Sequence, residues 1–514
     1  MQPKYLIELV KISKQSLPGM LAGLAILVAG CAEPPPPPAA PKPFQDITLR
    51  VAVPNVNKVR ELMERHGRIW ADRAGARLEL VAADAKADVR IFAPAEMGRL
   101  VAGGELAALS LASQKGEGSF EYNRLLRFEV ERSMDWGGQT YGLPVLGEAI
   151  VCVYRSDLLD DTKHSAELDK RFRDTLRHPY HAGGPFTWQE FALIAEYFAG
   201  RPGWDGSAGG VKQSLPPLPS SPEELERDFH LISSSFARRA VNHEKVSTLS
   251  AQEKTDLLFS YQFDVESGRP LIDGPGFVEA FKLMQRLQAF RPAGTSSRPL
   301  DAFRTGHAVL AIATLADIHG LQEESSPVHD RFAICRMPGS DLVYDHASNK
   351  MQVYTSSAGN FVPYHGHGGW MAGRAAKAAQ PEAANDLLIF LSSPPISQEI
   401  ICETAWGGGP TRSTHLDNRA PWFNYGLSHS RTLQLIAALD GYYRPSLLNP
   451  TYRLRLPDQD EYLRILTKRI ETALEMNQPA EAALKDVAQG WRALANDKNK
   501  STHLHDYRMS QGLR

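Results

Sequence analysis

The chain has 514 residues, of which 43% are hydrophobic and 23% charged, a composition typical of a globular protein with a substantial core. This length accommodates about two to four domains. The formal net charge at pH 7 is −2, without the concentrated basic stripe that nucleic-acid binding requires, so we expect no nucleic-acid partner.

The first 31 residues have the pattern of an export signal. Three lysines precede an apolar run over residues 17–29, which is shorter than the about 20 apolar residues of a transmembrane helix. The run ends in Leu-Val-Ala-Gly before Cys31, which resembles a bacterial lipobox. We interpret residues 1–31 as a lipoprotein signal peptide whose Cys31 is acylated and becomes the mature N-terminus. An uncleaved membrane anchor is the alternative, and both would export the rest of the chain and tether it to a membrane.

Residues 32–45 form a proline-rich linker with an unbroken proline run over residues 34–38. Proline favours extended polyproline II, so we expect a semi-rigid stalk between the lipid anchor and the folded part. Three further cysteines, Cys152, Cys335 and Cys402, show neither a disulfide framework nor a metal-binding spacing. The first two lie in apolar segments typical of buried strands.

The folded part opens with alternating strand and helix patterns. In chain order we expect a strand over residues 47–53, a helix over 56–69, strands over 78–81 and 88–92, and a helix over 96–109. This order favours an α/β layer with a largely parallel sheet. Ligands bind such sheets beyond the carboxyl ends of the strands, so the residues that follow each strand are candidates for a site.

The later elements are predicted from caps and periodicity. Thr187 and Glu190 fit a capping box that begins a helix. The other expected elements are a strand over 149–154, an irregular segment over 158–186, a loop over 200–222, a helix from 275, a strand over 308–314, a helix over 382–391, and two final helices that include 463–474 and 479–494.

Six groups of short motifs occur in an order that resembles the family 1 extracellular solute-binding proteins, the group that includes maltose-binding protein. They span roughly residues 46–415 and are residues 88–94, residues 141–144 with 154–159, residues 186–191, residues 303–310, residues 368–371 with 381–384, and residues 410–413. No motif alone is specific, but their shared order and spacing support the resemblance. The segment 158–186 and the tail after residue 420 depart from it.

The resemblance implies an α/β fold of the type II periplasmic-binding-protein class, a two-lobed clamp with discontinuous lobes and a helical C-terminal tail. The chain would cross between the lobes about three times, and closure would bury a ligand in the cleft. We expect residues 46–147 and 313–366 to form lobe 1, and residues 148–312 and 367–514 to form lobe 2.

Sugar recognition needs flat apolar surfaces and fixed hydrogen-bonding groups. Trp370 and Trp406 are candidates because glycines adjoin both, which would let the backbone approach a ligand; core packing is the alternative. Glu148 near the predicted hinge could accept two sugar hydroxyls, or it could be a solvated charge. By the resemblance, Phe92 and Glu96 lie where the family places ring-stacking and hydroxyl-binding side chains.

Further candidates are less distinctive. Tyr261, Phe263 and Asp264 form a polar and aromatic cluster, and Asp317 follows a predicted strand; either could be only a helix cap. Arg412 could bind a hydroxyl or carboxylate, or pair across a surface. The two histidines at 365 and 367 lack the neighbouring ligands of a metal site, so we expect no metal and no cofactor. No hydrolase or nucleotide-binding motif occurs, so we expect no catalytic residues.

The sequence thus predicts a monomeric, lipid-anchored protein of the cell envelope, on the periplasmic or extracellular face. It would capture a small ligand, expected to be a sugar or oligosaccharide, for the permease subunits of an ABC importer. One alternative is a secreted, lipid-anchored carbohydrate-active hydrolase in which Glu96 and Glu148 form a carboxylate pair. Another is a sensor or scaffold lipoprotein with the same clamp fold.

Overall fold

The computed structural model describes residues 42–110, 120–201, 213–355, 359–404, 406–443, 446–497 and 499–513. The predicted signal peptide, Cys31 and nearly all of the proline-rich linker lie outside these residues. Within the described part, each helix is either too short or too polar to cross a bilayer.

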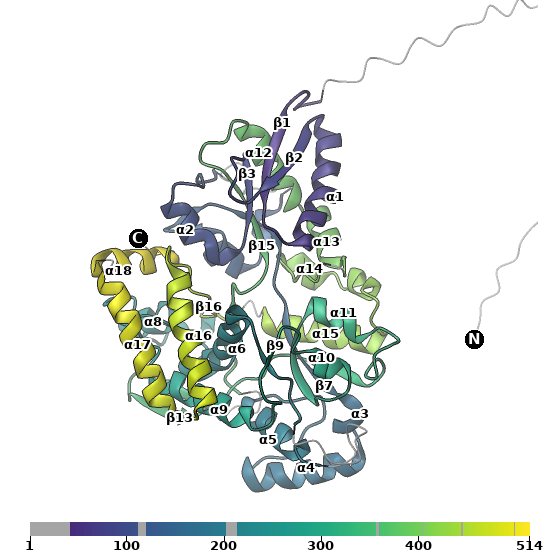
Figure 1. Cartoon of the computed structure of the whole chain (residues 1–514), viewed down its shortest axis with the longest axis vertical. Helices are drawn as coiled ribbons and strands as arrows, with labels where there is room; N and C mark the ends of the chain where they lie inside the picture. Colours follow the sequence, from purple (N-terminus) through teal and green to yellow (C-terminus); the bar gives the residue numbers. More distant parts are fainter. Residues whose placement is uncertain are drawn as a thin grey trace, which may run out of the picture. The chain divides into compact units, whose positions relative to one another are not determined.

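The first lobe is built on a five-stranded sheet in the order β2-β1-β3-β15-β6 (Figure 1). Its strands are β1 (Thr48–Val53), β2 (Arg77–Ala82), β3 (Val89–Phe92), β6 (Leu143–Leu146) and β15 (Trp370–Arg374). Strand β1 is parallel to β2 and β3, whereas β15 is antiparallel to β3 and β6. The helices of this lobe are α1 (Asn57–Ala74), α2 (Met97–Ala102), α12 (Pro381–Leu391) and α13 (Pro394–Cys402), and their apolar faces share one core with the sheet.

The second lobe has a three-stranded sheet in which β7 (Ile150–Arg155) lies between β10 (Leu310–Thr314) and β11 (Phe332–Cys335). Both outer strands are antiparallel to β7. A separate core surrounds this sheet. The helices of the second lobe are α3 (Ser156–Leu159), α4 (Thr162–Thr175), α5 (Trp188–Phe198), α6 (Pro222–Ala237), α7 (His243–Val246), α8 (Ala251–Phe259), α9 (Pro275–Gln288), α10 (Asp301–Arg304), α11 (Leu315–Leu321), α14 (Ser413–Asp417) and α15 (His429–Tyr442).

Several short strand pairs join loops around the two sheets. They are β4 (Asp135–Trp136) with β5 (Gln139–Thr140), β8 (Leu218–Pro219) with β9 (Thr295–Ser296), β12 (Leu342–Asp345) with β13 (Lys350–Val353), and β14 (Tyr364–His365) with β16 (Thr451–Tyr452).

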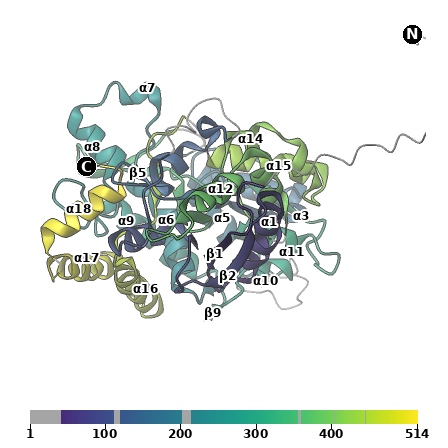
Figure 2. The ribbon, with the colours of Figure 1, turned by 90° about the horizontal axis from the view of Figure 1, so that it is seen from above.

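Three C-terminal helices, α16 (Gln459–Glu475), α17 (Ala480–Asp497) and α18 (Lys500–Ser510), lie together on one side of the described part (Figure 2). Helix α16 packs on α6 and α17 on α9, whereas α18 reaches β4 of the first lobe. The buried guanidinium of Arg455 donates to the carbonyls of Arg132 and Asp135 at 2.6 and 3.1 Å and also to that of Ser510. The C-terminal helices therefore contact both lobes.

Local signals predicted several elements well. The capping box is confirmed, because Thr187 Oγ1 accepts from the Glu190 amide at 3.2 Å and the Glu190 carboxylate accepts from the Thr187 amide at 3.3 Å. The helix from Pro275 is also confirmed as α9. The segment 158–186 was expected to be irregular, but it contains α4, which Asp161 caps by accepting from the amides of two following residues. The helix expected over 96–109 ends at Ala102.

The predicted lobe boundaries after residue 312 are wrong. Residues 313–366 were assigned to lobe 1, but α11 folds back on the second core and β11 pairs with β7 in the second lobe. Residues 367–514 were assigned to lobe 2, yet β15 pairs with β3 and β6 of the first sheet. The chain therefore returns to the first lobe after residue 366 rather than at residue 313, and Trp422 and Tyr425 lie again in the second core.

Within the described residues the chain crosses between the lobes at residues 147–148 (the first crossing), 366–369 (the second) and 409 (the third), and these segments contact one another through their backbones. Gly147 and Gly409 exchange two hydrogen bonds, with N···O distances of 3.2 and 2.9 Å. A Cβ on Gly409 would lie 2.0 Å from the Glu148 carbonyl oxygen, and one on Gly369 would lie 2.8 Å from that of Leu146. Because these neighbours are backbone atoms, they cannot move aside for a side chain.

Replacing Gly409 by alanine should therefore destabilise the protein by about 3 kcal/mol or more, because the added methyl group must displace the first crossing. Gly320 on α11 is the matched control: a Cβ there meets no atom within 4 Å, so Gly320→Ala should be neutral or slightly stabilising. The measurement is the unfolding free energy of both variants in urea. Equal changes in the unfolding free energy of the two variants would contradict the conclusion that the crossings leave no room for a side chain at Gly409.

Candidate functional site

The first turns of α6 bring a set of charged side chains to the junction of the lobes. The helix begins where the Ser221 side chain accepts from the amide of Glu224 at 3.3 Å, and Pro222 occupies its first position. The following turns carry charged and polar side chains that are buried, among them Glu226, Arg227 and His230. Buried charges need partners, and other segments of the chain supply them.

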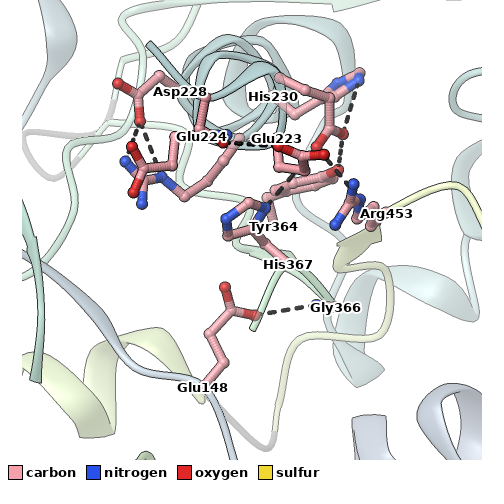
Figure 3. Close-up of polar contacts among 12 residues, drawn as sticks. Glu148, Glu223, Glu224, Asp228, His230, Tyr364, Gly366, His367 and Arg453 are labelled. Atoms are coloured by element: carbon pink, nitrogen blue, oxygen red, sulfur yellow. Dashed lines mark hydrogen bonds and ion pairs between the residues drawn. The ribbon is translucent and has the colours of Figure 1, made fainter. Parts of the chain in front are cut away.

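The carboxylate of Glu226 is the centre of this set, and three of its neighbours, Tyr364, His230 and Arg453, are labelled in Figure 3. It accepts a hydrogen bond from the Tyr364 hydroxyl, and it lies 3.5 Å from Arg453 Nε and 3.6 Å from His230 Nε2. Burial lowers the pKa of His230 to about 3, so this imidazole is neutral and Arg453 supplies the compensating positive charge. Burial also raises the pKa of Glu226 itself, against the opposing effect of Arg453.

Arg227 points to a different side of α6. Its guanidinium binds Asp228 Oδ1 at 2.8 and 3.0 Å, and both side chains are 11% exposed. Burial lowers the pKa of His367, and the charge of Arg227 adds to this effect; the same charge opposes the rise in the pKa of Glu148 that burial causes. Arg227 therefore lies within electrostatic range of both side chains. In Figure 3, His367 lies between Glu148 and the side chains of α6.

A polar cavity of about 530 Å³ adjoins Arg227. Glu224, Arg227 and Asp317 line it together with Arg298, Asp301, Arg304 and Ile312. On the first lobe, Lys58 near the start of α1 is half-buried and lies within electrostatic range of Asp317, and a Cβ on Gly407 would meet Ala316. The cavity therefore lies at a place where elements of the two lobes approach each other. Its carboxylates and guanidiniums can accept and donate several directed hydrogen bonds to a polyhydroxylated or otherwise polar molecule.

Two carboxyl groups are buried near the first crossing. Glu148 accepts from the Gly366 amide at 3.1 Å, but burial still raises its pKa to about 7. Glu129, in the short π-helical turn η4 (Glu129–Ser133), has its pKa raised by burial to about 8, and the nearby Glu148 adds to this rise. Both groups are therefore partly or largely protonated near neutral pH.

The structure brings two of the predicted site residues to this junction. Asp317 lines the polar cavity, although its carboxylate also caps α11 by accepting from the Thr314 amide at 2.8 Å. Glu148 lies at the first crossing and within electrostatic range of Arg227, facing the glycines of the second crossing. Tyr261 and Asp264 line a different cavity, of about 520 Å³, beside α8 and α9.

The other predicted residues pack in the cores, cap a helix or lie in a sheet, and none of them lines the polar cavity. Phe92, Phe263 and Trp406 are buried in the two cores. Glu96 caps the turn before α2 and pairs with Arg99 at 2.7 Å. Trp370 lies on β15, half-buried and opposite Leu146, so it belongs to the same lobe as Phe92 rather than to the other one.

Arg412 is fully buried, and its guanidinium donates to carbonyl oxygens of the first-lobe side. These carbonyls belong to Phe120 and Glu121, at 2.8 and 3.0 Å, and to Ser392, at 2.9 Å from Nε. With its donors occupied in this way, Arg412 holds the loop after the third crossing and is not available to a ligand. The expectation that it binds a hydroxyl or carboxylate is therefore wrong.

Sequence patterns did not identify Lys58, Glu224, Arg227 and Arg453 as residues of this junction. A usable signal existed for two of them. Ser221 followed by proline and two glutamates is a strong helix start, so the next turns could have been recognised as α6. Charged residues among the apolar positions of that helix would then have indicated a buried polar cluster. Arg453 carries no such local signal, because only tertiary structure places it beside Glu226.

Two lobes joined by three crossings, with a polar cavity where they approach, define a ligand-binding clamp. The family model of bacterial extracellular solute-binding proteins matches residues 72–424, and the chain belongs to this family. The family predicted from the order of the motifs is thereby confirmed. No curated protein matches the sequence.

Solved structures of similar fold include maltose-bound MalE3 of T. maritima, with a TM-score of 0.61 and 18% identity over 87% of this chain and 100% of that one. The sugar-binding protein MalE of Xanthomonas citri has a TM-score of 0.62 and 13% identity over 88% and 99% of the two chains. A solute-binding protein of Agrobacterium radiobacter K84 in complex with ribitol has a TM-score of 0.55 and 16% identity over 88% and 100%. These likenesses confirm the predicted two-lobed α/β fold.

The buried carboxyl groups predict a pH-dependent stability. The folded-state pKa of Glu129, about 8, lies above its ordinary value of 4.5, so the folded protein retains a proton that the unfolded chain has lost. The unfolding free energy should therefore decrease as the pH rises from about 4.5 towards 8. Glu129→Gln removes this contribution, so the variant should melt several degrees above the unmodified protein at pH 9 and close to it at pH 5.

Glu131→Gln is the control, because Glu131 is exposed and, among the described residues, its carboxylate forms an ion pair with Arg127 on the same turn. Its melting temperature should differ little from that of the unmodified protein at both pH values. A Glu129→Gln difference that stays constant from pH 5 to pH 9 would show that the Glu129 carboxyl titrates normally.

Proposed function

We propose that the protein is the substrate-binding component of an ABC-type importer and captures a sugar or polyol between its lobes. The observation that carries this proposal is the polar cavity, which Glu224, Arg227 and Asp317 of the second lobe line, with Lys58 of the first lobe within electrostatic range of Asp317. Hydroxyl groups both donate and accept, which suits a lining that mixes carboxylates with guanidiniums. Proteins of similar fold that bind maltose or ribitol support the same ligand class.

Binding in this cavity would favour the closed clamp only if the ligand contacts both lobes, because a ligand shifts an equilibrium by its differential affinity for the two states. Lys58 is the side chain through which the first lobe would make such a contact. We propose further that the protein acts without turnover, as a monomer, and delivers its ligand to permease subunits.

The test is a thermal-shift screen with maltose, ribitol and a panel of sugars, polyols and polyamines. A ligand at about 100 times its Kd adds about 2.7 kcal/mol of stability, which raises the melting temperature measurably. For the ligand that binds, Lys58→Met and Glu224→Gln should each weaken affinity about tenfold, since each removes a charged hydrogen-bonding group. Lys377→Met, on an exposed lysine of the first lobe, should bind normally.

Normal affinity in both site variants would place the ligand elsewhere in the protein. A response to polyamines but to no sugar or polyol would overturn the ligand class. Release of reducing ends from an oligosaccharide by the purified protein would favour the hydrolase alternative instead.

We also propose that the protein is exported and held at a membrane by a lipid on Cys31, as the lipobox-like sequence before this residue indicates. Cys31→Ser should then move the protein from the membrane fraction to the soluble fraction after export, because acylation needs the thiol. The measurement is detergent fractionation of cells that express each form, with Cys402→Ser as the matched control. Unchanged membrane association of Cys31→Ser would exclude the lipid anchor.

A further inference from the structure

A third cavity, of about 190 Å³, shares no lining residue with the polar cavity. It lies between residues 123–131 on one side and residues 363–365, 442–443 and 447–452 on the other. Most of its lining is apolar, from Leu125, Leu126, Pro363, Leu447, Leu448 and Pro450. An apolar cavity of about 150 Å³ is large enough to take up benzene, so this one is sized for a single six-membered ring.

Three stacked rings contribute to its lining. Phe128 and His365 lie 4.3 Å apart between ring centroids with an angle of 10° between their planes. Tyr443 lies 5.5 Å from Phe128 and 5.7 Å from His365, with angles of 21° and 12°. All three residues line the cavity, so flat aromatic groups and aliphatic side chains surround its contents together.

Two polar atoms in this lining have no hydrogen-bond partner among the described residues. They are Nδ1 of His365 and the hydroxyl oxygen of Tyr443, and the two residues are only 2% and 6% exposed. Leaving such a group without a hydrogen bond in a buried place costs about 1–3 kcal/mol. A bound molecule that forms hydrogen bonds with both atoms would remove this cost.

The polar groups of the lining favour an uncharged occupant. Burial lowers the pKa of His365 to about 3, so its imidazole is neutral, and burial raises the pKa of Tyr443, so its hydroxyl keeps its proton. The two charged residues of the lining, Arg127 and Glu131, bind each other at 2.7 Å. No net charge is therefore presented to a ligand by these four side chains.

We propose that this cavity binds a small, uncharged, monocyclic aromatic molecule with a hydroxyl group, a phenol-type compound, independently of the ligand between the lobes. The ring fits the apolar walls and the volume, and the hydroxyl pairs with His365 Nδ1 and the Tyr443 hydroxyl. A carboxylate in place of the hydroxyl would bring a charge into a neutral, buried place, and a saturated ring would lose the flat face.

The test uses the folded chain and phenol as the probe, with binding followed by saturation-transfer NMR and by titration calorimetry. Phenol should bind saturably, cyclohexanol at least tenfold more weakly, and benzoate at least tenfold more weakly at neutral pH. Tyr443→Phe keeps the ring and removes the hydroxyl, so it should weaken phenol binding about tenfold. Leu448→Trp should fill the cavity and abolish binding.

Tyr344→Phe is the matched control, because the hydroxyl of Tyr344 bonds Asn349 on an exposed hairpin outside this cavity, and its phenol affinity should not change. Melting temperatures and binding of the interlobe ligand show whether each variant is folded. If Leu448→Trp does not fold, the comparison of Tyr443→Phe with Tyr344→Phe decides alone.

No saturable binding of phenol would overturn the proposal and leave ordered water as the partner of the two polar atoms. Equal binding of cyclohexanol or benzoate would overturn the ligand class. Binding that survives both Tyr443→Phe and Leu448→Trp would show that phenol occupies another place on the protein.

Discussion

The arrangement of the two lobes depends on how closely three separate chain segments pass one another between them. Gly147 and Gly409 pair through their backbones, and Gly369 lies against the Leu146 carbonyl, so this junction has no room for side chains. Backbone contact of this kind leaves no space for the segments to approach one another further. Glu148, which follows the first crossing, is held at the same junction by the Gly366 amide.

The buried Glu226 carboxylate imposes a second constraint. Moving a carboxylate out of water costs several kcal/mol unless charges and hydrogen bonds replace the solvent, and here Tyr364, Arg453 and neutral His230 do so. These residues come from distant parts of the sequence. The cluster consequently ties α6, the second crossing and the start of the C-terminal helices into one unit, which supports Arg227 where it adjoins the polar cavity. Stability and site geometry thus rest on the same buried charges.

Local chemistry explains what could be predicted from the sequence. The Thr187 capping box and the proline that starts α9 are decided within one helical turn, so both were found, and the family followed from the order of such motifs. Lobe membership after residue 312 was mispredicted because it depends on β11 pairing with β7, a contact over a long sequence separation. Trp406 and Arg412 have suggestive sequence neighbours, yet burial decides their roles, and a single sequence does not report burial. Arg453 beside Glu226 is likewise a product of tertiary structure alone.

The contact of α18 with the first lobe has a practical consequence for handling the protein. The carbonyl of Ser510, the last residue of α18, accepts from the buried Arg455, and the Gly137 amide donates to the Met509 carbonyl at 2.9 Å. An affinity tag or fluorescent partner attached close after α18 would lie near these bonds between the C-terminal helices and the first lobe. Sensors and purification handles are better inserted in an exposed hairpin turn, such as the one between β12 and β13, where residues 346–349 connect two strands at the surface.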